Sequence, residues 1–129
     1  MNAQIAEDYV SFGVAKLLKE KGFDIECSAL YDRFHEDLPQ VGFEPQNFNN
    51  GTIRKDIVSA PTLQMARKWL RLIHSIDISI TPDRVKNYTA LVFVNKELPF
   101  TSIGSFKTYE KACEAAIKYC LENLGEDEN

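Results

Sequence analysis

The chain lacks the sequence features that most directly identify enzymes and membrane proteins. It contains no glycine-rich phosphate loop, no Ser-His-Asp order and no Cys-His pair in a supporting context. Its longest apolar stretches, around 76–80 and 90–94, fall far short of the roughly 20 residues that span a bilayer. The first residues show no basic region followed by an apolar one, so we expect no signal peptide. The sequence therefore offers no catalytic, metal-binding or cofactor-binding residue, and it predicts a cytoplasmic protein that does not bind membranes.

Cysteine is scarce, with three residues in a chain of 129. Cys113 and Cys120 lie on one expected helix, where their spacing separates them by about 10 Å and prevents a disulfide between them. Cys27 stands in an expected strand, from which it could meet either of the other two. We interpret all three as buried, reduced thiols rather than as a disulfide framework.

Acidic residues outnumber basic ones, and the excess is unevenly distributed. The formal net charge is −4, which argues against attraction of the whole protein to nucleic acid. Residues 61–124 nevertheless hold nine basic and six acidic side chains, a charge of +3, so the rest of the chain carries −7. With 44% hydrophobic residues, the chain is long and apolar enough to form one domain around a continuous core.

The first half of the chain predicts a helix, a strand, a long loop and a return strand. Apolar residues at helical spacing, followed by Gly22 as a stop, predict a helix over about 8–21. Alternation of apolar with polar or small residues predicts a strand over 23–31, and 52–59 predicts a short strand that pairs with it. Between these strands, 32–51 is rich in proline, glycine and asparagine, which favours an irregular loop.

The second half predicts a helix, three strands and a final helix. A capping serine or threonine within 59–62 precedes a helix that ends near Ser75. Short connections between the strands favour an antiparallel meander. Thr108 is expected as the N-cap of the last helix and Gly125 as its stop. The apolar stripe of the earlier helix consists of Leu63, Ala66, Trp69, Leu70 and Ile73, with Trp69 as its buried anchor. The three strands are expected at 76–81, 88–95 and 100–106.

These elements predict a single α+β domain over 1–129, in the order α-β-(loop)-β-α-β-β-β-α. We expect a largely antiparallel sheet with helices packed on one face, and flexible ends at 1–7 and 125–129. The expected strand 88–94 is apolar on both alternating sets in its second half. A homodimer and burial beneath the long loop both explain that pattern, and the sequence leaves the choice open.

Three parts of the chain carry a resemblance to known sequences. They are YVSF and AKLLKEKGF at 9–12 and 15–23, APTLQMA and KWLR at 60–66 and 68–71, and YEKACEAAI at 109–117. They resemble a family of short uncharacterised proteins of gut anaerobes and of their prophages or other mobile elements. The resemblance implies a small cytoplasmic or phage-associated protein, and it supplies no activity or site residue.

A second resemblance concerns the order of elements in the C-terminal half. Helix, three strands and helix over 61–124, with GSFK at 104–107 before an alanine-rich helix, look like a double-stranded-RNA-binding domain. That resemblance implies phosphate contacts from Lys107 and Lys111 at the N-terminus of the last helix. The denser lysine cluster usual in that family is missing, and Glu110 and Glu114 intervene.

Basic side chains crowd one flank of the helix that follows residue 62. Helical spacing brings them together, and with two lysines of the last helix they make the best electrostatic site in the sequence. Such a face suits an acidic partner or a nucleic-acid backbone, while the alternative is a solvated helix face. The candidate residues are Arg67, Lys68, Arg71, His74, Lys107 and Lys111.

The expected loop 32–51 is the other candidate site. Its aromatic residues Phe34, Phe43 and Phe48 either fold back over the core as a flap or bind a partner. His35 stands near several acids in this loop, but the spacing matches no established metal loop, and we interpret the group as a polar loop.

The sequence supports one leading hypothesis about function and two alternatives. The leading one is a small non-enzymatic adaptor or interaction protein that binds another macromolecule, most simply a protein, through 32–51 or the basic face. The first alternative is direct nucleic-acid binding through the basic residues, with affinity that falls steeply with salt. The second is an enzyme or small-ligand binder, which requires a concave pocket that sequence does not reveal.

Overall fold

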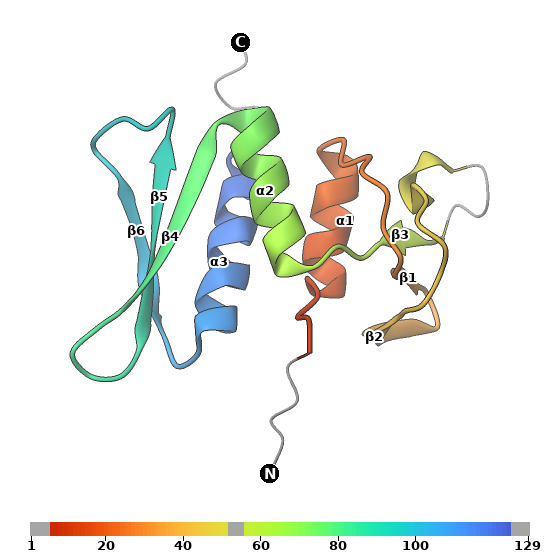
Figure 1. Cartoon of the computed structure of the whole chain (residues 1–129), viewed down its shortest axis with the longest axis horizontal. Helices are drawn as coiled ribbons and strands as arrows, with labels where there is room; N and C mark the ends of the chain where they lie inside the picture. Colours follow the sequence, from red (N-terminus) through yellow and green to blue (C-terminus); the bar gives the residue numbers. More distant parts are fainter. Residues whose placement is uncertain (1–5, 52–55, 125–129) are drawn as a thin grey trace.

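The computed structural model describes residues 6–51 and 56–124, and Figure 1 shows how they are layered. Three helices, α1 (Phe12–Glu20), α2 (Leu63–His74) and α3 (Tyr109–Glu122), lie in the middle of the molecule. A three-stranded antiparallel sheet lies on each side of this helical layer. The predicted α+β class, antiparallel pairing and order of elements are confirmed. The strands differ from expectation in forming two sheets instead of one.

The C-terminal sheet is the meander that the sequence predicts. It consists of β4 (Ile76–Pro82), β5 (Tyr88–Val94) and β6 (Thr101–Phe106), paired in that order. Alternate residues of β4 and β5 are buried, because one face of the sheet packs against α2 and α3. The opposite face carries no helix, as Figure 1 shows.

The N-terminal sheet is smaller and differs from the prediction. It consists of β1 (Leu30–Asp32) between β2 (His35–Gln40) and β3 (Val58–Ser59). Of the predicted return strand 52–59, only Val58 and Ser59 form β3, which pairs antiparallel with β1, and 52–55 lie outside the described residues. The predicted loop 32–51 is wrong in part, because it contains β2 and the 3-10 helix η1 (Phe48–Asn50).

The predicted strand over 23–31 is also wrong for most of its length. Only its last two residues belong to β1, and before them Cys27 forms an isolated antiparallel bridge with Gln46. The alternating pattern reflects burial, since Phe23, Cys27 and Ala29 are buried, and not continuous pairing. A strand needs a neighbouring backbone along its length, and this segment finds one at a single point.

The helices begin at the polar caps typical of helix N-termini. The side chains of Ser11, Thr62 and Thr108 each accept a hydrogen bond from the backbone three residues later. The first helix begins later than predicted, because the residues before it pair with the chain that leads into α2. Val10 N–H donates to Pro61 O at 3.0 Å, and a backbone paired in this way is not helical.

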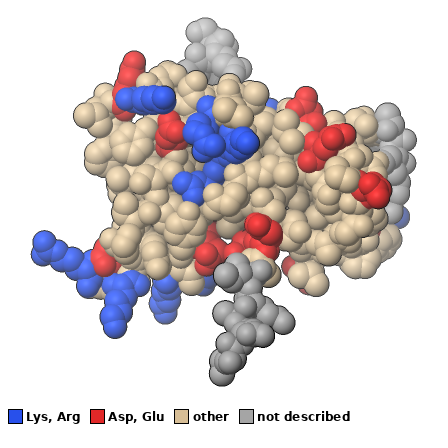
Figure 2. Space-filling model, in the orientation of Figure 1, with Lys and Arg blue, Asp and Glu red and all other residues tan. Residues whose placement is uncertain are grey.

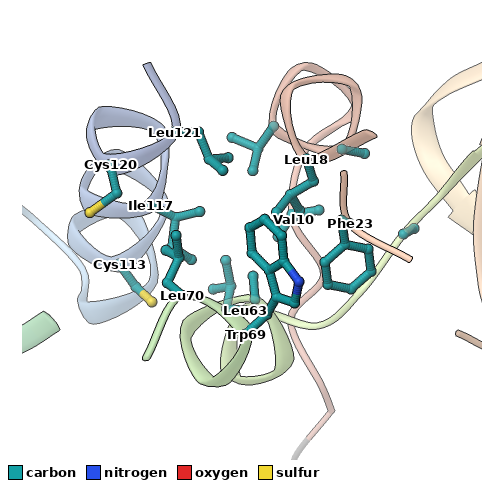
Figure 3. Packing of buried hydrophobic residues seen from close by; sticks show 14 of the residues in the cluster. Val10, Leu18, Phe23, Leu63, Trp69, Leu70, Cys113, Ile117, Cys120 and Leu121 are labelled. Atoms are coloured by element: carbon teal, nitrogen blue, oxygen red, sulfur yellow. The ribbon is translucent and has the colours of Figure 1, made fainter. Parts of the chain in front are cut away.

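The main core lies where the three helices meet (Figure 3). Trp69 is 5% exposed, and its ring packs edge-on against Phe23 at 5.4 Å between centroids. Ile117 and Leu121 of α3 point toward the other two helices in Figure 3. The predicted burial of Trp69 is therefore confirmed, and its ring contacts are with Phe23 after α1 and with His74 of α2.

One residue of α2 differs from the prediction, and the predicted flexible ends lie mostly outside the described residues. Ile73 is exposed, so its predicted place on the buried apolar stripe is wrong. The next residue, His74, packs against Trp69 instead, with 4.8 Å between the two ring centroids. The expected flexible ends, 1–7 and 125–129, fall almost wholly outside the described residues, as does Gly125.

The three cysteines are free and buried, as predicted. Burial raises the pKa of Cys27 and of Cys113 to about 11, and that of Cys120 to about 12. Within the described part of the chain, no helix is both long enough and apolar enough to cross a bilayer.

Candidate functional site

The predicted basic face is not a single surface, because Arg67 serves the fold. Its Nη1 donates to the Tyr109 hydroxyl at 2.7 Å and its Nη2 donates to the Ile78 carbonyl at 2.6 Å. These bonds connect α2 to both α3 and β4. His74 also belongs to packing, since its Nε2 is buried without a hydrogen-bond partner and its ring lies against the core. Neither side chain is available to a ligand.

The other predicted cations are exposed but divided among three places. Lys68 and Arg71 lie on the outer side of α2, where Figure 2 shows a basic patch. Lys107 follows β6 at the end of the sheet where the turn between β4 and β5 lies. Lys111 belongs to the first turn of α3 and lines the groove described below.

The predicted aromatic partner loop is also divided. Phe48 is buried and packs edge-on against Phe43 at 5.7 Å between ring centroids, as a core flap would. Phe34 is 69% exposed, and its ring lies 4.7 Å from the guanidinium carbon of Arg33. The flap hypothesis therefore describes the end of the segment 32–51, around Phe48, whereas Phe34 near the beginning of the segment faces solvent.

A groove between β2 and α3 has a volume of about 860 Å³. We call it the β2–α3 groove. Three parts of the chain supply most of its lining: residues 37–39 and Val41 in and after β2, one side of α3 from Glu110 to Lys118, and the segment that leads into α1. The groove therefore lies at the seam between the N-terminal sheet and the helical layer, and neither half of the chain forms it alone.

Hydrogen bonds hold the segment that leads into α1 in position between β2 and α3. Ser11 N–H donates to Glu114 Oε1 at 2.9 Å, which ties the start of α1 to α3. The Tyr31 hydroxyl donates to Val10 O at 2.6 Å, which ties the same segment to β1. Burial raises the pKa of Tyr31, and the nearby Glu114 carboxylate raises it further, so this hydroxyl stays protonated and donates.

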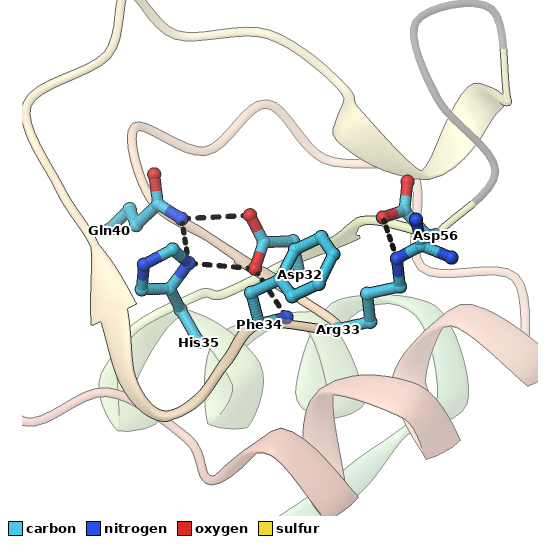
Figure 4. Close-up of polar contacts among 6 residues, drawn as sticks. All are labelled: Asp32, Arg33, Phe34, His35, Gln40 and Asp56. Atoms are coloured by element: carbon cyan, nitrogen blue, oxygen red, sulfur yellow. Dashed lines mark hydrogen bonds and ion pairs between the residues drawn. The ribbon is translucent and has the colours of Figure 1, made fainter.

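A polar cluster around Asp32 holds β2 in place (Figure 4). The buried Asp32 carboxylate accepts hydrogen bonds at 2.9 Å from the Phe34 backbone, from His35 Nδ1 and from Gln40 Nε2. The hydrogen bond from His35 is the main cause of a lowered Asp32 pKa. Since His35 and Gln40 are the first and last residues of β2, one carboxylate anchors both ends of that strand.

Between these anchored ends, β2 presents apolar side chains to the groove. Leu38 is 75% exposed and Val41, just beyond the strand, is 58% exposed. Exposed apolar residues are common singly, but two of them beside a groove form a contact surface. The candidate residues predicted in this segment were its aromatic ones, and Leu38 and Val41 were missed. Their position as apolar residues in a polar stretch was the signal that could have found them.

A bulge in β6 sets the position of Phe106, which also lines the groove. Tyr88 pairs with Phe106 and Ala90 with Ile103, so β6 contains one residue more than β5 over this stretch. Gly104 takes φ +47° there, and the Phe106 ring covers the place where a Cβ would lie, at 2.9 Å. Any side chain at 104 would displace that ring from its position.

The groove is acidic. Five carboxylates line it against two ammonium groups, Lys111 and Lys118, so its net charge is −3. Figure 2 shows acidic side chains gathered where the chain enters α1, at the lower middle of the view. The carboxylates come from both sides of the groove and from the segment between them: Glu7, Asp8, Asp37, Glu110 and Glu114.

The groove shows no arrangement for metal chemistry. Across residues 6–51 and 56–124, no three His, Cys, Asp or Glu side chains are grouped so that they could hold a metal ion. Comparison of the chain with family models, curated proteins and solved structures finds no match. The geometry of the β2–α3 groove is therefore the main guide to function.

Proposed function

We propose that this protein is a small non-catalytic interaction protein, which holds a segment of a partner protein in the β2–α3 groove. The single observation that carries the proposal is a groove of about 860 Å³ with exposed Leu38 and Val41 along one side. Protein-binding surfaces combine apolar with polar side chains, and the lining of the groove holds both. We still expect a cytoplasmic location and membership of the family of short proteins of gut anaerobes and their prophages that the sequence resembles.

The anchoring of both sides of the groove favours the binding of a partner segment. The Asp32 cluster holds β2, and the Ser11–Glu114 bond holds the start of α1 against α3. A groove whose sides are fixed before binding loses less conformational entropy when a partner enters.

A photocrosslinking experiment in the native cell tests the proposal. A photoreactive amino acid at position 38 is compared with the same residue at position 98, because Leu38 and Leu98 are equally exposed, at 75% and 76%. We expect a discrete crosslinked polypeptide from position 38 that is absent from position 98. Val41→Glu should abolish that product without lowering the melting temperature. Identical products from both positions would contradict the proposal.

The end of the C-terminal sheet supports nucleic-acid binding as a second candidate function. Arg84 and Lys86 lie in the turn between β4 and β5, which reaches the end of β6 through a hydrogen bond of 3.1 Å from Asn87 Nδ2 to Ser105 Oγ. Lys107 follows two residues later, so three cations gather at this end. In this candidate site Arg84 and Lys86 take the place of Arg67, whose guanidinium forms hydrogen bonds within the fold.

Fluorescence anisotropy with duplex RNA and duplex DNA between about 50 and 200 mM salt tests this second candidate. The double variant Arg84→Gln, Lys86→Gln should weaken binding and reduce its salt dependence. Lys68→Gln, Arg71→Gln on the outer side of α2 is the matched control. Binding that both double variants reduce equally would assign it to nonspecific attraction instead.

A further inference from the structure

We infer that the segment held in the β2–α3 groove is short, extended and basic, with an apolar side chain that contacts Leu38 and Val41. The inference rests on the proposed function and names the chemistry of its ligand. It follows from the charge of the groove, from the pairing of its carboxylates and from its length.

The groove carboxylates form no ion pair with Lys111, Lys118 or any other described residue. Among the described residues, Arg33 forms an ion pair with Asp56 and the His35 ring contacts the Asp32 carboxylate, and neither contact involves the groove. Glu114 uses one oxygen to accept the Ser11 N–H. The carboxylates of Glu7, Asp8, Asp37 and Glu110 therefore have no ion-pair partner and are open to lysine or arginine of a ligand.

The acidic character is local and opposes the charge of its surroundings. Residues 61–124 carry +3 as a whole, and α3 lines the groove with two carboxylates and two lysines, which balance. The net charge of −3 therefore comes from Glu7, Asp8 and Asp37. Asp37 contributes a carboxylate from the opposite side, on β2. Carboxylates on both sides attract a cationic chain that lies between them and repel nucleic acid and acidic peptides.

The length of the groove limits what it holds. The α3 residues that line it extend from Glu110 to Lys118, which spans about 12 Å along the helix axis. An extended chain advances about 3.3 Å per residue, so roughly four residues lie within the groove.

Selection from a random library of displayed 12-residue peptides tests the inference on the full chain. The selected peptides should be enriched in lysine and arginine beside a single large apolar residue. Their binding should weaken about tenfold in Asp37→Asn, Glu110→Gln, because two exposed ion pairs are lost. The control Asp24→Asn, Glu26→Gln removes two exposed carboxylates outside the groove and should leave binding unchanged. Melting temperatures confirm that all variants fold.

The possible outcomes separate this inference from the proposed function. Peptides without basic enrichment, whose binding is lost in Leu38→Ser but not in Leu98→Ser, would overturn the inference and leave a protein-binding groove. Selected peptides that bind equally to Leu38→Ser, or a selection that enriches nothing, would overturn both.

Discussion

Replacement of Arg67 by methionine removes two hydrogen bonds that connect α2 to its neighbours and keeps most of the packing of the side-chain stem. The lost partners are the Tyr109 hydroxyl, at 2.7 Å, and the Ile78 carbonyl, at 2.6 Å. The first lies on α3 and the second on β4, so the guanidinium joins three elements at one point. The sequence predicts that Arg67 belongs to a binding face, whereas in the structure its hydrogen bonds stabilise the fold.

The magnitude of the effect follows from these contacts. Hydrogen bonds to charged groups contribute about 1.5–3 kcal/mol each, and the lower end applies because Arg67 is half-buried. Two such bonds give an expected loss of about 3 kcal/mol in the free energy of unfolding. For a chain of this size that corresponds to a decrease of roughly 10 °C in Tm.

Urea titration and thermal melting measure the loss, and Arg71→Met is the matched control. Arg71 lies one turn further along α2 and is exposed, so its replacement should change stability by less than about 0.5 kcal/mol. Tyr109→Phe removes one of the two bonds and should cost about half as much as Arg67→Met. If Arg67→Met were as stable as Arg71→Met, the structural role of Arg67 would be refuted.

Three further predictions concern the core, the thiols and the β2 cluster. Trp69→Ala should lower the free energy of unfolding by about 3–5 kcal/mol in urea titration, and a loss below about 1 kcal/mol would contradict its burial. Cys27, Cys113 and Cys120 should resist a disulfide reagent at pH 8 until guanidinium unfolds the protein, because their raised pKa values keep them protonated; rapid reaction of the folded protein would count against this. The lowered pKa of Asp32 means that its carboxylate stabilises the fold above its ordinary pKa of about 3.9, and that this contribution disappears as the pH falls through the folded-state pKa. The Tm values of wild type and Asp32→Asn should therefore converge between pH 7 and pH 3, and a constant difference would disprove the link.

The C-terminal half was predictable because its signals are local. Thr62 and Thr108 cap α2 and α3 as expected, and the three strands begin and end within about one residue of the predicted positions. A helix N-cap and a meander of neighbouring strands depend on residues close together in sequence. The N-terminal half depends on distant pairing, and there the prediction was less accurate.

The candidate site shows the same division. Lys111 was a predicted site residue and lines the groove, whereas Arg67 was predicted for the same face and serves the fold. Both residues have the charge and spacing of a binding face, and only their neighbours in space distinguish them. Leu38 and Val41 were missed because their importance comes from the α3 residues opposite them, about 70 positions later in the chain.

The sequence by itself determined the α+β class, the presence of three helices, the caps of α2 and α3, the C-terminal meander and the burial of Trp69 and the cysteines. Each of these follows from periodicity, capping residues or composition within a short segment. The tertiary structure alone decided the division of the strands into two sheets, the use of Arg67 as a clamp and the acidic β2–α3 groove. Those features arise where segments far apart in the chain meet, and the hydrogen bonds and burial made there depend on which segments come together.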